Sequence, residues 1–188
     1  MSQPELLRRV VAVLNDLRID YMLTGSMASS LHGGPRSTHD IDLVVALRPE
    51  YCDPLYSAFD PSAFYLSRSA IAEALAHGRM FNLLEYADGD KVDFWILTDE
   101  PFDRSRFARK RLEKFLGMRV NVSTPEDTIL AKLRWAMLSG GSQKQLADAR
   151  SILDLQGDSL DTTYIETWAR EIGVESLWDR IRSESEHS

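Results

Sequence analysis

Paired aspartates stand where a protein could hold a divalent cation. Asp40 and Asp42 lie two residues apart in the branched apolar run 40–47, DIDLVVAL, which predicts a strand. Because side chains of a strand alternate between its faces, both carboxylates point one way and Ile41 points to the other. Two like charges about 6–7 Å apart on an apolar element need a counter-ion, and carboxylate oxygens suit Mg²⁺ or Mn²⁺. The alternative is that the pair lies at the solvent-exposed end of a strand and caps a neighbouring loop.

A third carboxylate, Asp93, occurs in a second apolar run, KVDFWIL (91–97). On this strand Asp93 shares a face with Trp95, and an acid in such a run needs a partner. If the strand pairs beside 40–47, the three carboxylates meet. Such a group can hold one or two metal ions for in-line phosphoryl chemistry.

A candidate phosphate site precedes the aspartate pair. The apolar run 21–25, YMLTG, predicts a buried strand that ends at Gly25, and Ser26 opens a short helix. The first amides of a helix are free and carry the positive end of its dipole, so they bind phosphate. Gly25 lets the backbone approach, and Ser26 offers a hydroxyl. Many helices start in this way, and the chain has neither a dinucleotide-binding glycine motif nor a P-loop.

The elements that position these residues fall into two groups. Apolar spacing and turn residues predict helices over residues 4–18, 26–34, 49–59 and 69–78, a hairpin at Asp88-Gly89 between strands 80–87 and 91–97, and a smaller hairpin around Gly117. Thr124 caps a helix that runs to Ser139, and helices at 144–156, 162–172 and 174–184 follow. We therefore expect an α/β part (1–122) and a helical part (123–188), packed as one unit because the joint is short.

The composition of the 188-residue chain excludes several classes of protein. The hydrophobic fraction of 44% and charged fraction of 27% are those of a globular protein, not of a disordered chain or a fibre. The one cysteine, Cys52, excludes an internal disulfide framework and a cysteine-rich zinc site. No apolar run approaches the roughly 20 residues of a membrane span, and the N-terminal residues lack a signal core. We expect a cytoplasmic protein without a membrane partner.

Together, these motifs resemble the nucleotidyltransferase superfamily related to DNA polymerase beta. The resemblance is carried by Gly25-Ser26, by Arg36-x-Thr38-x-Asp40-Ile41-Asp42-Leu43-Val44-Val45, by Asp93, and more loosely by Lys132 in ILAKL and by Asp148. The spacing is most similar to the AbiEii-type branch, which includes toxins of type IV toxin–antitoxin systems. The resemblance covers about residues 20–155. It implies an α/β nucleotidyltransferase fold, in which a mixed sheet is flanked by helices and followed by a C-terminal helical bundle.

The resemblance also implies roles for these residues. Asp40, Asp42 and Asp93 would hold Mg²⁺ or Mn²⁺, and Asp93 would help to activate the attacking hydroxyl. Residues that would bind the nucleotide are Gly25, Ser26, Arg36, Thr38, Lys132 and Asp148. Among these, Gly25 and Ser26 would bind the triphosphate, Lys132 would reach a phosphate, and Asp148 would orient Lys132 or the substrate. The alternatives are that Arg36 and Thr38 only shape a loop and that Lys132 is a solvated lysine beside an apolar stripe.

The acceptor of the nucleotide is suggested by the resemblance to toxins and by the distribution of charge. The net charge is −7, yet the segment Arg104–Arg119 holds seven basic residues and one acid. Such a segment favours an RNA acceptor, such as a tRNA end. The alternative is that these cations pair with the acidic helices of 144–188. The resemblance leaves open an antibiotic-type small-molecule acceptor, a non-catalytic nucleotide- or partner-binding module of the same fold, and an antitoxin partner.

Overall fold

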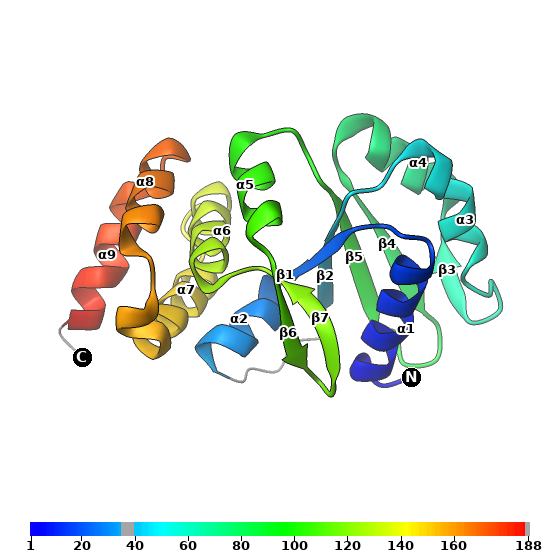
Figure 1. The fold of residues 1–188 in the computed structure, drawn as a ribbon, viewed down its shortest axis with the longest axis horizontal. Coiled ribbons are helices and arrows are strands. Elements are labelled where there is room, and N and C mark those ends of the chain that lie inside the picture. Colours follow the sequence, from blue (N-terminus) through cyan, green and yellow to red (C-terminus); the bar gives the residue numbers. More distant parts are fainter. Residues whose placement is uncertain (35–39, 187–188) are drawn as a thin grey trace. The chain divides into compact units, whose positions relative to one another are not determined.

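A computed structural model describes residues 1–34 and 40–186 of the chain (Figure 1). Its helices are α1 (Gln3–Asp16), α2 (Gly25–Gly33), α3 (Cys52–Ser57), α4 (Arg68–His77), α5 (Pro101–Arg109), α6 (Pro125–Leu138), α7 (Gln143–Gln156), α8 (Thr162–Glu171) and α9 (Glu175–Glu186), with 3-10 turns at Pro49–Tyr51 and Gly157–Ser159. Its strands are β1 (Tyr21–Thr24), β2 (Asp40–Val45), β3 (Phe64–Leu66), β4 (Met80–Glu85), β5 (Lys91–Ile96), β6 (Arg111–Phe115) and β7 (Met118–Val122).

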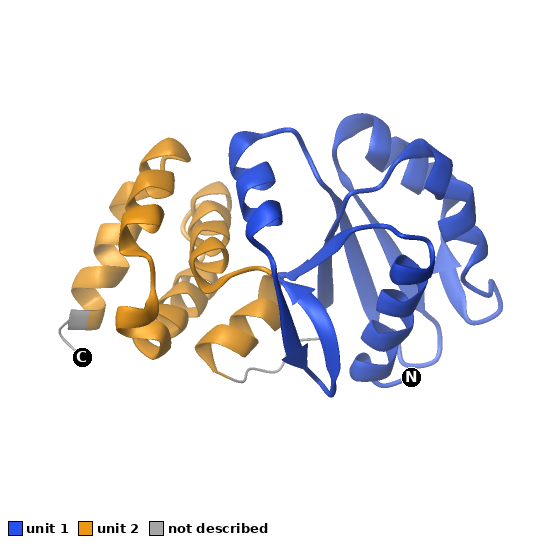
Figure 2. Ribbon diagram, in the orientation of Figure 1, with its two compact units in different colours: residues 1–24, 38–122 blue, residues 25–37, 123–188 orange. Residues whose placement is uncertain are grey.

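The chain divides into two compact units (Figure 2). Unit 1 contains residues 1–24 and 38–122, and unit 2 contains residues 25–37 and 123–188. Helix α2, which the sequence analysis places in the first part of the chain, therefore belongs to unit 2. The reason is its packing, because the backbone of α2 at Gly33 lies directly against α7.

Unit 1 is built on a mixed sheet. Within the described residues the strands form one seven-stranded sheet in the order β3-β4-β5-β2-β1-β7-β6. The pairs β2–β5 and β1–β7 are parallel, and the other neighbours are antiparallel. The predicted hairpin at Asp88-Gly89 is present as β4–β5. Gly89 has a φ of 74°, the left-handed conformation that such a turn needs and that glycine adopts without strain.

The two faces of this sheet differ in character. On one face the side chains of Ile41, Leu43 and Phe94 are fully buried, and the rings of Phe94 and Phe81 stack with centroids 4.9 Å apart. On the other face, Phe107 of α5 packs against buried residues of β1 and β2, so α5 covers part of it. The aspartates of β2 lie on this second face.

Unit 2 consists of helices. The predicted cap of α6 is present: the Thr124 hydroxyl accepts a hydrogen bond from the Asp127 amide at 3.2 Å and donates to the Asp127 carboxylate at 2.7 Å. The Tyr164 hydroxyl of α8 donates to the other Asp127 oxygen at 2.6 Å. The Thr124 side chain thereby satisfies one of the backbone amides that the buried start of α6 leaves free, and Thr124 and Tyr164 satisfy the Asp127 carboxylate. The mixed sheet and the helical C-terminal portion confirm the predicted α/β fold class.

Three elements differ from the predictions. The helix expected over 49–59 is a 3-10 turn followed by α3, because Pro54 has no amide hydrogen and fits only the first turn of a helix. Helix α5 was not predicted, since Phe102 and Phe107 are its buried side chains and they make no helical stripe. Strand β3 has three residues, too few to show alternation.

Across residues 1–34 and 40–186, none of the helices has both the length and the apolar character needed to span a membrane.

Candidate active site

Two aspartates from neighbouring strands lie side by side in unit 1. Strands β2 and β5 are parallel, and Asp42 pairs in register with Asp93. Residues in register on adjacent strands project to the same face of the sheet, and so does Asp40, two residues before Asp42. Lys91 pairs in register with Asp40 and completes a group of four charged side chains. The structure therefore places the three predicted aspartates on one face of two adjacent strands.

Asp93 is the most buried member of the group, with 7% of its surface exposed. Its Oδ1 accepts a hydrogen bond of 2.8 Å from Asn82 Nδ2 of β4, and its Oδ2 accepts one of 2.9 Å from the Lys91 ammonium. A buried carboxylate is costly unless both oxygens have partners. Asn82 and Lys91 supply them and fix the direction in which the carboxylate points.

The Lys91 ammonium connects Asp93 with Asp40. Its Nζ lies 2.9 Å from Asp93 Oδ2 and 3.7 Å from Asp40 Oδ1. The hydrogen bond to Asp93 raises the pKa of the Lys91 ammonium above its usual value, so this group is charged at neutral pH. Asp42 has a different neighbour, because its Oδ1 accepts a hydrogen bond of 3.2 Å from Trp95 Nε1.

The donor atoms of this group suit a hard divalent cation. Among the described residues, no three His, Cys, Asp or Glu side chains lie close enough together to hold a metal ion as they stand. A cationic group, the Lys91 ammonium, nevertheless lies within 4 Å of both Asp40 and Asp93. Carboxylate oxygens that already share one cation fit Mg²⁺ or Mn²⁺ in the same role. The donor atoms present are therefore of the oxygen type that Mg²⁺ and Mn²⁺ prefer, and the metal stays a prediction.

The nucleotide-binding residues predicted from the sequence fall in unit 2 or outside the described part. Gly25 and Ser26 begin α2, and Gly25 has a φ of 64°. Lys132 of α6 and Asp148 of α7 form a buried ion pair, with 2.8 Å between Lys132 Nζ and Asp148 Oδ2. Lys132 is therefore not the solvated lysine of the alternative interpretation. Arg36 and Thr38 lie outside the described residues.

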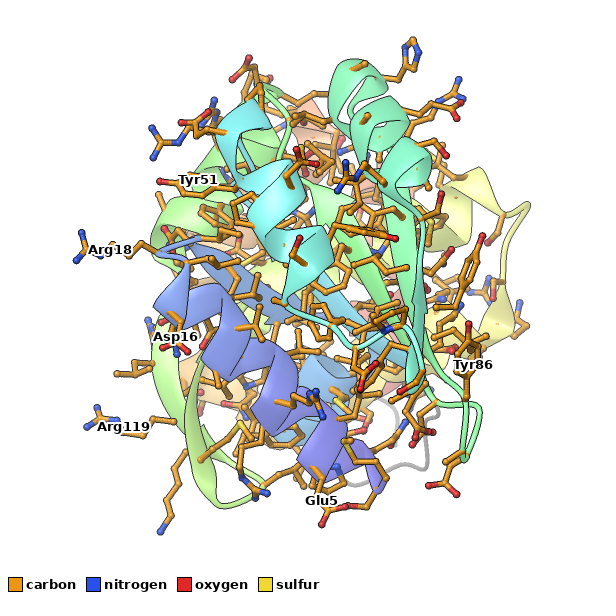
Figure 3. All side chains as sticks on the ribbon, turned by 90° about the vertical axis from the view of Figure 1, so that its right-hand side faces the viewer. Glu5, Asp16, Arg18, Tyr51, Tyr86 and Arg119 are labelled. Atoms are coloured by element: carbon orange, nitrogen blue, oxygen red, sulfur yellow. The ribbon has the colours of Figure 1, made fainter. Side chains whose placement is uncertain are left out.

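The basic segment Arg104–Arg119 spans α5, β6 and β7 of unit 1. Several of its cations pair with acids of the same unit: Arg104 with Asp99, Arg106 with Asp103, and Lys110 with Asp20. These pairs differ from the alternative in which the segment pairs with the helices of 144–188. Lys114 and Arg119 face each other across the β6–β7 hairpin and are exposed, and the Arg119 side chain extends outward (Figure 3).

Sequence reasoning missed two residues that contact the aspartates, Lys91 and Asn82. The alternation Lys-x-Asp at 91–93 was a usable signal, because it places the lysine on the face of Asp93. Asn82 carried no such signal. Its contact with Asp93 depends on the register of the β4–β5 hairpin, which sets Asn82 directly opposite Asp93.

Comparisons with known proteins give a fold. No family model matches the chain, and no curated protein sequence matches it. The structure is similar to that of the antibiotic-resistance factor ANT(2'')-Ia in complex with adenylyl-2''-tobramycin, with a TM-score of 0.56, 16% identity, and 98% of this chain and 99% of that chain covered. It is also similar to the lincosamide antibiotic adenylyltransferase LnuA, with a TM-score of 0.52, 9% identity and coverage of 81% and 96%. A nucleotidyltransferase-like protein from Paracoccidioides brasiliensis gives a TM-score of 0.50, 20% identity and coverage of 91% and 90%. The chain therefore has the nucleotidyltransferase fold.

Proposed function

We propose that the protein is a metal-dependent nucleotidyltransferase that moves a nucleoside monophosphate from an NTP to a hydroxyl group and releases pyrophosphate. The observation that carries this proposal is the placement of Asp40, Asp42 and Asp93 on one face of β2 and β5, in a chain with the nucleotidyltransferase fold. Three like charges on one face of a sheet repel one another, so such a face lowers stability unless cations offset the repulsion. A role in binding cations and phosphates explains why the chain carries it.

In this proposal Asp40, Asp42 and Asp93 would hold Mg²⁺ or Mn²⁺, which when bound neutralises phosphate charge and orients the reacting groups. The acceptor oxygen bonds to the α-phosphorus while the bond from that phosphorus to pyrophosphate breaks. Asp93 would polarise the attacking hydroxyl and receive its proton. Its hydrogen bond from Asn82 holds one carboxylate oxygen in place, so the other is directed to the site.

The nucleotide would be bound by residues of unit 2. Gly25 and Ser26 would bind the triphosphate at the start of α2, where backbone amides and the helix dipole favour anions. Arg36 and Thr38 would also contact the nucleotide. Lys132 would reach a phosphate, with Asp148 orienting it through the ion pair between α6 and α7.

For the acceptor we propose an RNA end, such as that of a tRNA. Lys114 and Arg119 support this choice, because like charges directly opposite each other on a hairpin are destabilising and phosphates would relieve the repulsion. The AbiEii-type resemblance agrees with this acceptor and extends to a toxin held in check by an antitoxin protein.

A second acceptor class, a small antibiotic-type molecule, is favoured by a different observation. Of the structurally similar proteins, ANT(2'')-Ia is described as an antibiotic-resistance factor and LnuA as a lincosamide antibiotic adenylyltransferase. Ion pairs inside unit 1 also engage part of the basic segment, which weakens the argument for RNA. The third alternative is a module of the same fold that binds a nucleotide or a partner without turnover.

One experiment separates these possibilities. The protein is incubated with α-³²P-labelled NTPs, magnesium, and either total tRNA, tobramycin or lincomycin, with Asp42→Asn as the inactive control. We expect label on tRNA with the wild type and none with Asp42→Asn. Label on an antibiotic alone would select the small-molecule acceptor. NTP binding without transfer to any of these acceptors would favour the non-catalytic module.

A further inference from the structure

Lys91 occupies a particular place among the carboxylates of unit 1. It begins β5 and lies opposite Asp40, and its side chain reaches along its own strand to Asp93. The ammonium is attracted electrostatically to Asp93, Asp40 and Asp42. One flexible cation thus serves the same three groups that the proposed function assigns to a metal.

The two partners of Asp93 have different effects: Asn82 positions its carboxylate, and Lys91 compensates its charge. Asn82 is neutral, so its hydrogen bond to Oδ1 positions the carboxylate but leaves its charge uncompensated. Lys91 brings the compensating charge, at 2.9 Å from Oδ2. Because Asp93 is 7% exposed, a charge without such compensation would be costly there.

A divalent cation held by Asp40 and Asp93 would compete with Lys91, whose ammonium contacts both of these carboxylates. Two cations within a few ångströms of each other repel. The Lys91 side chain is 37% exposed, so it can rotate into solvent without rebuilding the core. The exchange therefore requires the movement of one side chain only.

We propose that Lys91 is an internal counter-ion of the carboxylate group, that a divalent cation displaces it on binding, and that Lys91 thereby lowers the affinity of the site for metal. The inference rests on the proposed function, because it concerns the same three aspartates. In the metal-free protein Lys91 keeps the carboxylate face stable. In the metal-bound protein it is released from Asp93.

The test compares Lys91→Met, which keeps the length of the side chain and removes its charge, with Lys91→Arg, which keeps the charge. Lys110→Met is the matched control, because Lys110 forms an ion pair of the same 2.9 Å length with Asp20 elsewhere in unit 1. Mn²⁺ affinity is measured by isothermal titration calorimetry without nucleotide, and Tm is measured in EDTA and in saturating Mn²⁺.

We expect Lys91→Met to bind Mn²⁺ about fivefold more tightly than the wild type, since an exposed or partly buried ion pair of this kind must be broken in the wild type only. In EDTA its Tm should fall, and Mn²⁺ should raise that Tm by more than it raises the Tm of the wild type. Lys91→Arg and Lys110→Met should keep Mn²⁺ affinities within about twofold of the wild type.

Equal or weaker Mn²⁺ binding by Lys91→Met, with the wild type still binding, would overturn the role of Lys91 and leave the proposed function standing. Absence of Mn²⁺ binding in the wild type and in all variants would overturn the metal site itself. If Lys91→Met does not fold in EDTA, Lys91→Ala folded in Mn²⁺ replaces it in a competition with EDTA, and an unchanged EDTA midpoint would contradict the proposal.

Discussion

At the scale of single residues, the aspartate face places conflicting demands on stability. Asp93 is nearly buried and its oxygens are held by Asn82 and Lys91, while Asp42 lies in register beside it. Leaving a buried carboxylate without partners costs several kcal/mol, so this arrangement tolerates the loss of charge at Asp42 better than the loss of a partner at Asp93.

The first prediction concerns Asp42→Asn. The amide oxygen can still accept the hydrogen bond from Trp95, whereas one of three clustered negative charges is removed. We expect nucleotidyl transfer to fall at least about a thousandfold, because a metal ligand is lost. In EDTA, Tm should be equal to that of the wild type or higher, because repulsion decreases.

Label transfer and thermal unfolding in EDTA measure the two effects. Asp99→Asn, an exposed aspartate that pairs with Arg104, serves as the control and should retain transfer. A marked fall in Tm for metal-free Asp42→Asn would assign Asp42 a structural role.

A second prediction concerns Tyr21, which is buried in β1. Burial raises the pKa of the Tyr21 phenol above its ordinary value of about 10, although hydrogen bonds with Asn121 and Asn15 oppose the shift. A raised pKa means that the unfolded chain loses the proton first. The stability that Tyr21 contributes is therefore complete below pH 10 and is lost as pH rises through the folded-state pKa.

Tyr21→Phe should lower the free energy of unfolding by about 1 kcal/mol at pH 7, because the substitution removes the hydroxyl and its hydrogen bonds with Asn121 and Asn15. The difference in free energy of unfolding between the wild type and the variant should shrink above pH 10. The wild type loses the contribution of Tyr21 there, whereas phenylalanine does not titrate. Urea unfolding between pH 7 and pH 11 measures this, and Tyr65→Phe is the control because Tyr65 is 55% exposed. A difference that is constant across this range would contradict the prediction.

At the scale of elements, predictability follows the kind of signal that each element carries. Strand β2 could be predicted because branched apolar residues alternate with Asp40 and Asp42, and the face assignment of these residues follows from that alternation. Helix α5 could not be predicted, because its two buried side chains, Phe102 and Phe107, form no helical stripe in an otherwise largely polar sequence. The contact between Asn82 and Asp93 depends on the register of β4 against β5, which a single sequence does not contain.

Helices α2 and α7 of unit 2 approach each other closely at Gly33. A Cβ built on Gly33 would lie 2.8 Å from both Cγ1 and the backbone nitrogen of Ile152. At the same end of α2, Ser151 donates to the Gly33 carbonyl and Gln156 donates to the His32 carbonyl at 2.8 Å. Side chains of α7 thus satisfy carbonyls that the end of a helix leaves free.

The third prediction is that Gly33→Ala destabilises the protein by about 1–2 kcal/mol, because overpacking outweighs the gain in helix propensity. Tm should fall by about 3–6 °C, as measured by thermal unfolding. In an Ile152→Ala background the cost should be smaller, because one of the two close contacts is removed. A Gly33→Ala protein as stable as the wild type would show that α2 and α7 lie further apart.

At the scale of the whole molecule, charge is distributed unevenly on an acidic chain. The net charge is −7, and acids of unit 1 engage Arg104, Arg106 and Lys110. The β6–β7 hairpin differs, because Lys114 and Arg119 lie opposite each other on its exposed side. The pair Lys114 and Arg119 on this hairpin is therefore the part of the basic segment on which the RNA proposal is best tested.

The last prediction reverses this pair. In Lys114→Glu/Arg119→Glu, two like charges still face each other, so the cross-strand repulsion and the stability of the hairpin change little. If these cations bind phosphates, tRNA binding should weaken, and the slope of log K against log salt should flatten by about 1.4–1.8 because two phosphates are no longer neutralised. Nucleotide binding should survive.

Filter binding between about 50 and 200 mM salt measures the slope. Arg8→Glu/Arg79→Glu, which reverses two other exposed arginines of unit 1, is the control of equal charge. Equal slopes for the two variants would mean that the hairpin contributes only through net charge, and the small-molecule acceptor would then be the stronger proposal.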